Sequence, residues 1–188
     1  DSRISPNLLT QTEPGELFIC HNAGNIVPPH SNHTGGTTAS VEFAVGALNI
    51  KHIIVCGHTE CGAMKGAMNP EGLEDMPHVC EWLSYARAAV QIVKEKAKTT
   101  KHSEEQKMAM LIEENVLLQM QHLKTHPYVA AQLATGQLVI HGWVYDIKTG
   151  QVTAYDEAKK AFISVEEHYA DEVEAFAGQT IRYSDTAC

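Results

Sequence analysis

The stretch IIVCGHTECGAM, residues 53–64, is the part of the sequence that most directly decides the fold. Its β-branched, apolar start predicts a buried strand, and Gly57 marks the point where the chain leaves the sheet. His58 then follows at the carboxyl end of that strand, which is where open α/β sheets bind their ligands. A neutral imidazole and a thiolate three residues apart, at His58 and Cys61, can reach one tetrahedral Zn²⁺. For this pair taken alone, the structural alternative is a buried cysteine beside a loop histidine.

Outside this stretch, predicted strands alternate with predicted helices. Apolar runs predict strands at residues 17–21, 52–57, 137–147 and 151–155. Apolar residues at helical spacing predict helices at residues 37–48, 60–68, 78–97, 104–126 and 127–136. This alternation indicates an α/β protein, with a parallel sheet, right-handed crossovers and helices packed on the faces of the sheet.

The composition indicates one globular domain of 188 residues with a formal charge of −9. A negative charge without any basic stretch argues against nucleic-acid binding, because phosphate contacts need Lys and Arg. We find neither an 18-residue apolar run nor a signal segment at the start of the sequence. Five scattered cysteines suit a reducing compartment better than a disulfide framework, and Cys20, Cys56 and Cys80 lie among apolar residues, as core cysteines do.

Further blocks extend the pattern. They are Asp1-Ser2-Arg3, GELFICHNAGNIVPP at residues 15–29, GGTTASVEFAV at residues 35–45 and HGWVYD at residues 141–146. Together with residues 53–64 they resemble β-class carbonic anhydrases. That family has Cys-x-Asp-Ser-Arg, a strand ending in Arg-Asn-Ala-Gly-Asn, a glycine-rich link to a helix, and then Gly-His-x-x-Cys-Gly.

The resemblance covers the chain up to about Tyr155. The sequences of residues 4–11 and 56–66 are most similar to those of the cyanobacterial, carboxysome-associated branch. It implies that residues 1–155 form the catalytic domain and that residues 156–188 form a partly helical C-terminal tail. It also implies a mostly parallel central sheet with one antiparallel edge strand and helices on both faces.

The family's activity implies a zinc enzyme that hydrates carbon dioxide reversibly to bicarbonate and a proton, by attack of hydroxide generated at the metal. His58 and Cys61 match two of the zinc ligands. The third is the cysteine two positions before the Asp of Asp-Ser-Arg, so we expect it upstream of Asp1. Asp1 would accept a hydrogen bond from the hydroxide, and Arg3 would hold that carboxylate through paired bonds. A surface ion pair is the alternative for Asp1 and Arg3.

By position, Phe18, Ala23, Phe43 and Gly62 match the small apolar pocket of the family, which suits carbon dioxide because that molecule carries no charge. The chain departs from the family at two positions. Phe43 stands where several relatives have Tyr, so a hydroxyl group is lost. His21 replaces the Arg that ends the strand in most relatives and helps to hold an inhibitory bicarbonate in some, so bidentate anion binding there is expected to weaken.

The implied partners are carbon dioxide or bicarbonate as substrate, further copies of the chain in a homodimer or a higher multiple of dimers, and carboxysome shell or scaffold proteins. Nucleic acid and membrane are not among them, and the implied location is cytoplasmic or carboxysomal. One alternative is a hydrolase of carbon disulfide or carbonyl sulfide on the same scaffold, which assays with each gas would separate. Another is a metal-poor, non-catalytic relative, which metal analysis would identify. A nucleotide-binding Rossmann domain is a remote alternative, because no Gly-x-Gly-x-x-Gly follows a strand.

Overall fold

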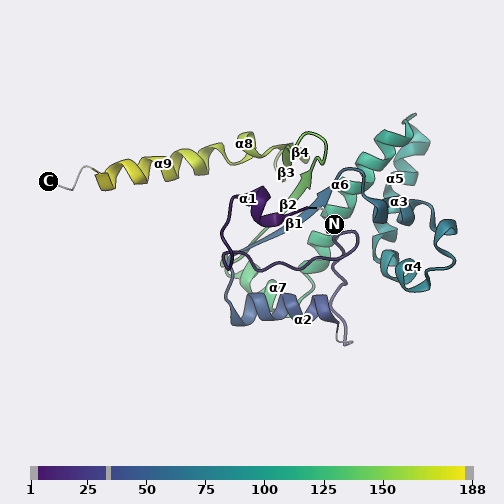
Figure 1. The fold of residues 1–188 in the computed structure, drawn as a ribbon, viewed down its shortest axis with the longest axis horizontal. Helices are drawn as coiled ribbons and strands as arrows, with labels where there is room; N and C mark the ends of the chain where they lie inside the picture. The colour runs from purple at the N-terminus through teal and green to yellow at the C-terminus, as the bar shows by residue number, and fades with distance from the viewer. Residues whose placement is uncertain (1–3, 33–34, 185–188) are drawn as a thin grey trace.

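The computed structural model describes residues 4–32 and 35–184, with residues 178–184 described by their backbone alone. At its centre is a four-stranded sheet in the order β1-β2-β3-β4 (Figure 1). The strands are β1 (His52–His58), β2 (Val139–Tyr145), β3 (Val152–Asp156) and β4 (Ala161–Ser164). β1 and β2 pair in parallel, whereas the β2–β3 and β3–β4 pairs are antiparallel. The α/β class is confirmed. The sequence predicted one antiparallel edge strand, whereas the sheet has two antiparallel strands, β3 and β4, because β4 continues the sheet past residue 155.

The prediction of a strand at residues 17–21 is wrong. These residues form an irregular segment that pairs with no strand in the part of the chain that the structure describes. Phe18 and Ile19 keep 47% and 42% of their surface exposed. An apolar run favours extended backbone, but a strand also needs a neighbouring ladder of N–H and C=O groups, which this segment lacks.

Helices and helical turns form the other regular elements of the described residues. They are α1 (Pro6–Thr10), α2 (Gly36–Glu42), η1 (Phe43–Ala47), α3 (Gly62–Met68), η2 (Pro70–Leu73), α4 (Pro77–Leu83), η3 (Ser84–Ala86), α5 (Arg87–Thr99), α6 (Glu104–Leu123), α7 (Pro127–Ala134), α8 (Val165–His168) and α9 (Ala170–Ser184). The predicted helix at residues 78–97 is divided by the 3₁₀ turn η3. This tighter turn allows both Leu83 and Ala86 to be buried in the core.

Helix α6 packs against β1 and β2, and two glycines allow its close approach to the sheet. A Cβ atom on Gly57 would lie 2.8 Å from Val116 Cγ2, and a Cβ atom on Gly142 would lie 2.6 Å from Met120 Sδ. Both distances are shorter than van der Waals contact, so a side chain at either position would force Val116 or Met120 of α6 to shift. The absence of side chains therefore lets Val116 and Ile112 of α6 approach β1 at Gly57, next to His58.

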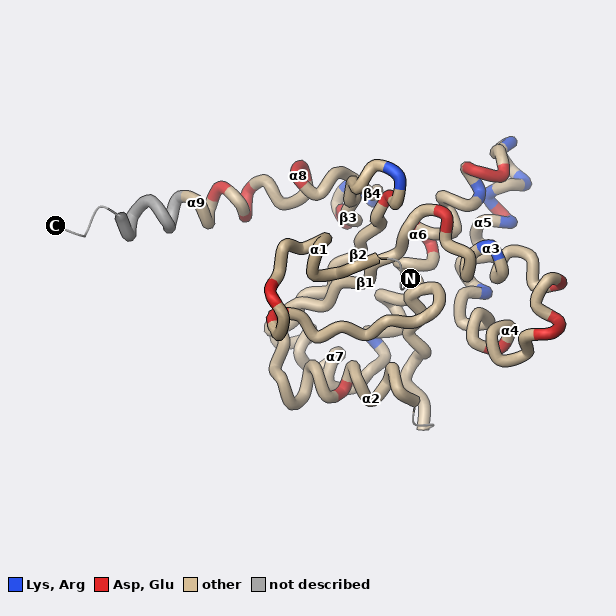
Figure 2. Tube along the Cα trace, in the orientation of Figure 1, with Lys and Arg blue, Asp and Glu red and all other residues tan. Residues whose placement is uncertain are grey.

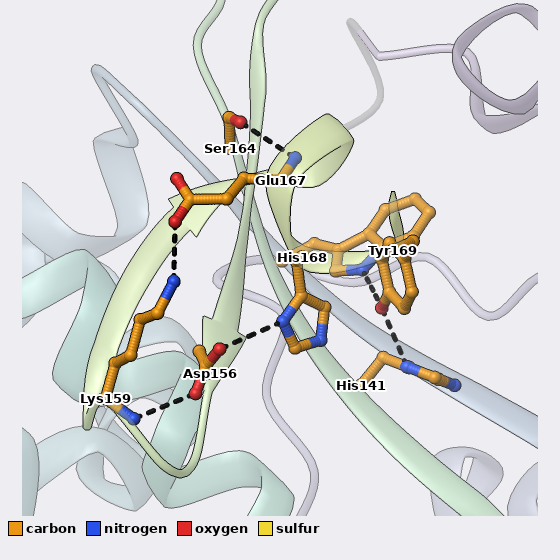
Figure 3. A network of polar contacts seen from close by, with 8 residues as sticks. His141, Asp156, Lys159, Ser164, Glu167, His168 and Tyr169 are labelled. Atoms are coloured by element: carbon orange, nitrogen blue, oxygen red, sulfur yellow. Dashed lines mark hydrogen bonds and ion pairs between the residues drawn. The ribbon is translucent and has the colours of Figure 1, made fainter. Parts of the chain in front are cut away.

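Helix α8 attaches the C-terminal segment to the sheet, whereas α9 extends away from it (Figure 1). Ser164 Oγ accepts a hydrogen bond from the N–H of Glu167 at 3.1 Å, and Lys159 Nζ donates to Glu167 Oε1 at 2.5 Å (Figure 3). Tyr169, between the two helices, points toward His141 on β2, with its hydroxyl 2.8 Å from Nδ1 (Figure 3). These contacts join the tail to the sheet at both β2 and β4.

A chain of hydrogen bonds runs from Trp143 through Tyr169 and His141 to His52. Trp143 Nε1 donates to the Tyr169 hydroxyl at 3.0 Å, so the hydroxyl proton is available for His141 Nδ1. The N–H at His141 Nε2 then donates to His52 Nδ1 at 3.1 Å. An additional proton on His141 Nδ1 would prevent this nitrogen from accepting the hydrogen bond from Tyr169.

Acidification below about pH 6.5 is therefore expected to weaken the folded state through His141. Burial, followed by the charges of His52 and His168, lowers the pKa of His141 below 6.5, and Glu172 opposes this shift. Because the folded pKa is the lower one, the unfolded chain binds the extra proton. Stability from this group is complete above about pH 6.5 and declines as the pH falls toward the folded pKa. Thermal unfolding between about pH 7.5 and about pH 5 measures the decline. A His141→Gln variant should decline less steeply, and equal slopes would exclude His141 as the cause.

Candidate active site

His58 is buried at the carboxyl end of β1, where it is 3% exposed. Its Nδ1 lies 2.8 Å from the carbonyl oxygen of Thr59, so Nδ1 carries a proton and donates it to that carbonyl. Thr59 is itself held in place: its N–H donates to the carbonyl of Tyr145 at 2.9 Å, and its Oγ1 accepts from the N–H of Ile147 at 3.0 Å. The β1–β2 pair and the residues that follow it therefore set the orientation of the imidazole.

Cys61 precedes the first turn of α3 and is also 3% exposed. Burial alone would raise the pKa of its thiol. The hydrogen bond with His58 and the bonds from the backbone N–H groups of Met64 and Ala63 outweigh this effect and hold the pKa below its usual value. The structure therefore places a thiol with a lowered pKa beside the imidazole of His58, and the role of the pair as metal ligands stays a prediction.

These two side chains fit part of a zinc site. Nitrogen of imidazole and sulfur of a thiolate are the donors that Zn²⁺ prefers, and the Thr59 carbonyl is the kind of partner that orients zinc-binding histidines. Within residues 4–32 and 35–177, no third His, Cys, Asp or Glu joins them to complete a donor set. The third predicted ligand precedes Asp1, outside the described residues, and stays a prediction.

The other predicted site residues are placed only in part. Asp1 and Arg3 lie outside the described residues, so their roles stay predictions. Phe18 and Phe43 lie together, with ring centroids 6.2 Å apart. Their side chains remain 47% and 53% exposed, so in the described chain they form an open aromatic surface rather than a closed pocket.

Ala23 and Gly62 are related through the turn that follows Ala23. A Cβ atom on Gly24 would lie 3.2 Å from the Cβ of Ala63, so this turn packs on the first turn of α3, which begins at Gly62. Trp82 Nε1 donates to the carbonyl of Ala23 at 2.8 Å. The sequence did not indicate this last contact, because it joins residues that lie far apart in the chain and carry no motif.

Comparison with known proteins agrees with this partial site. A carbonic anhydrase family model matches residues 1–152. Carbonic anhydrase of Pseudomonas aeruginosa is 46% identical over 182 residues, which cover 95% of this chain and 79% of that protein. Carbonic anhydrase of Synechococcus elongatus is 46% identical over 153 residues, which cover 81% of this chain and 56% of that protein, so the match spans little more than half of the cyanobacterial enzyme.

The fold agrees as well. The solved structure of the β-carbonic anhydrase CcaA superposes with a TM-score of 0.82 and 42% sequence identity, over 87% of this chain and 73% of that chain. The resemblance stated from the sequence motifs is thus confirmed by both sequence and structure. The chain belongs to the β-carbonic anhydrase family, lyases that hydrate carbon dioxide.

Proposed function

We propose that this chain hydrates carbon dioxide reversibly to bicarbonate and a proton, at a zinc ion held by His58, Cys61 and a third protein ligand outside the described residues. The observation that carries the proposal is the buried pair itself. Both residues are 3% exposed, and the hydrogen bond between them contributes to the low pKa of Cys61. The lowered pKa of this buried thiol supports a metal-ligating role, because zinc binds the thiolate form of cysteine.

Each residue near the pair has a defined task in this proposal. When bound, zinc acts as a Lewis acid that brings the pKa of a water molecule down to about 7. His58 supplies Nε2, because the Thr59 carbonyl occupies Nδ1. Cys61 supplies the thiolate, which the N–H groups of Ala63 and Met64 stabilise. Burial of both ligands keeps bulk water from competing with them.

The proposed substrate surface is uncharged. From Leu17 to Val41 the chain contains no Asp, Glu, Lys or Arg. Figure 2 shows this segment and the start of α2 without charged residues, whereas such residues are frequent on α5 and along α8 and the start of α9. Phe18, Ala23 and Phe43 belong to this uncharged region or adjoin it, and we propose that they line the approach of carbon dioxide. A neutral, weakly polar substrate fits an apolar surface of this kind.

Two measurements on purified protein test the proposal. Metal analysis should find about one zinc per chain. Steady-state assays should find carbon dioxide turned over in preference to carbonyl sulfide and carbon disulfide. Protein that holds no zinc and hydrates no carbon dioxide would contradict the proposal and would support the metal-poor relative.

Asp1→Asn is expected to lower carbon dioxide hydration by at least about tenfold, a loss of about 1.4 kcal/mol in transition-state stabilisation. In the proposed mechanism the Asp1 carboxylate accepts a hydrogen bond from the attacking oxygen and aims its lone pair at the substrate, while Arg3 holds the carboxylate. An amide at this position also presents a donor, so it does not enforce that orientation. Stopped-flow hydration assays measure the effect.

Asp171→Asn, on the exposed part of α9, is the matched control for the loss of one negative charge. It should leave turnover unchanged. If Asp1→Asn has the turnover of the wild type, the role proposed for Asp1 is wrong.

The location and the assembly partners of the chain are predicted from its sequence. In the described residues, no helix is both long enough and apolar enough to cross a membrane. We predict a cytoplasmic or carboxysomal location, with carboxysome shell or scaffold proteins as partners. The sequences of residues 4–11 and 56–66 support this prediction. The role of His21 in bicarbonate binding also stays a prediction.

A further inference from the structure

The segment from Asn22 to His30 packs into the protein without forming a helix or a strand. Ile26, near its middle, is 0% exposed. Buried backbone groups in such a segment must find hydrogen-bond partners outside regular structure. Asn22 supplies two of them, because its side chain donates to the carbonyl of Ile26 and accepts from the N–H of Ile26, each at 2.8 Å. Other partners come from α6 and α4.

Three polar side chains of α6 hold this segment. Asn115, Gln119 and His122 recur at intervals of four and three residues, so they lie on one face of the helix. Asn115 Nδ2 donates to the carbonyl of Gly24 at 2.9 Å. The N–H of Val27 donates to Gln119 Oε1 at 2.9 Å, and His122 Nδ1 donates to the carbonyl of Val27 at 2.8 Å. We call these three side chains the α6 polar row.

The two amides of the α6 polar row are linked to each other and fully buried. Gln119 Nε2 donates to Asn115 Oδ1 at 2.9 Å, and both residues are 0% exposed. A buried amide destabilises a protein unless its donor and acceptor are both used, and an apolar side chain of similar size fills the same volume without that requirement. Asn115 and Gln119 each use an amide N–H group and the amide oxygen in hydrogen bonds to the segment or to each other. What these amides do that an apolar side chain could not do is therefore to fix the position of the segment's backbone.

The other side of the segment rests on the helix that follows Cys61. The turn at Gly24 packs against Ala63 of α3, and Trp82 holds the carbonyl of Ala23. Gly24 and Asn25 have φ values of 81° and 46°, in the left-handed region that most residues avoid. Gly and Asn adopt this region more readily than other residues, so the local sequence permits the turn, and packing fixes its position. The α6 polar row holds it from one side, and α3 and Trp82 hold it from the other.

We propose that Asn115 and Gln119 are positioning residues, which fix the turn at Ala23–Asn25 relative to α3 and so set the place of Ala23 beside the active site. This inference rests on the proposed function, in which Ala23 lines the approach of carbon dioxide. Loosening the turn leaves His58 and Cys61 in place but changes the surface that receives the substrate. The KM for carbon dioxide should therefore respond more strongly than kcat.

Asn115→Leu and Gln119→Met, made separately, test this role. In each variant we expect the KM for carbon dioxide to rise by at least about fivefold, while kcat per bound zinc changes by less than about twofold. Hydrogen exchange followed by mass spectrometry gives a readout independent of activity. The amides of Ile26 and Val27 should exchange at least about tenfold faster than in the wild type. The amides of β1 should keep their protection.

Thr125→Val is the matched control. Thr125 Oγ1 accepts from the N–H of His30 at 2.8 Å, which is a contact of the same kind just after α6 but beyond the turn. This variant should lose that bond and leave the KM unchanged. If Asn115→Leu does not fold, Gln119→Met still tests the proposal, because it removes the bonds from Gln119 to Val27 and to Asn115.

Two failures are distinguishable. In the first, the wild type hydrates carbon dioxide, and the folded variants have the same KM as the wild type. Their activity falls only as much as their content of zinc-loaded protein falls. The amides then contribute to stability alone, and the positioning role is overturned. If the wild type binds zinc and does not hydrate carbon dioxide, the proposed function is overturned, and the positioning role with it.

Discussion

Replacement of Cys61 by alanine is expected to abolish zinc retention and to lower carbon dioxide hydration by at least about a hundredfold. Metal activation of water contributes several kcal/mol to catalysis, and each 1.4 kcal/mol corresponds to a factor of about ten. Cys61 supplies a thiolate whose low pKa depends on His58 and on the N–H groups of Met64 and Ala63. Alanine keeps the backbone of α3 and removes only this donor, so the folded state should survive the change.

Cys56 on β1 provides the matched control. Burial raises the pKa of the Cys56 thiol to about 11, so at neutral pH this side chain is a thiol and not a metal-binding thiolate. Cys56→Ala should retain about one zinc per chain and the activity of the wild type. Metal analysis and stopped-flow hydration assays measure both properties. Full zinc content and full activity in Cys61→Ala would show that the ligand assignment is wrong.

The features that were predictable from the sequence are those with a local pattern. β1 was predictable because it has three consecutive β-branched residues shortly before Gly57, and the positions of His58 and Cys61 follow directly from where that strand ends. The helix that became α6 was predictable from its apolar spacing, and its start at Glu104 follows a capping box formed by Ser103 and Gln106. In each case neighbouring residues carry the whole signal.

Features that depend on distant partners were not predictable in this way. Residues 17–21 have the composition of a strand, but strand formation depends on a neighbour that their own sequence does not specify. Asn115 and Gln119 belong to no motif, and their partners Gly24 and Val27 lie 91 and 92 residues away, so these bonds carry no sequence signal. Roles of this kind require coordinates, or a comparison of many related sequences.

The exposed apolar surface of the chain predicts an assembly. Seven large apolar residues on or next to α1, residues 17–20, η1 and the sheet remain between 39% and 73% exposed. They are Leu8, Phe18, Ile19, Phe43, Leu48, Ile54 and Val139. Ile54 and Val139 lie on the face of the sheet opposite to α6, because side chains alternate along a strand and both are three positions from a glycine that faces α6. Monomeric proteins rarely leave so much apolar surface in contact with water.

We therefore expect an obligate homodimer or a multiple of dimers, in which dissociation and loss of activity coincide. Obligate interfaces commonly bury more than about 2,000 Å² and leave no stable folded monomer. Ile54→Lys should weaken association by at least about tenfold, because burying an unpaired ammonium group costs more than the 1.4 kcal/mol that this factor represents. Ile92→Lys is the matched control: Ile92 is 41% exposed, close to the 39% of Ile54, but lies on α5, away from the sheet. Sedimentation at decreasing protein concentration, with activity measured on the same samples, tests the assembly. A folded and fully active monomer would refute it, because the apolar surface would then be stable in water without a partner.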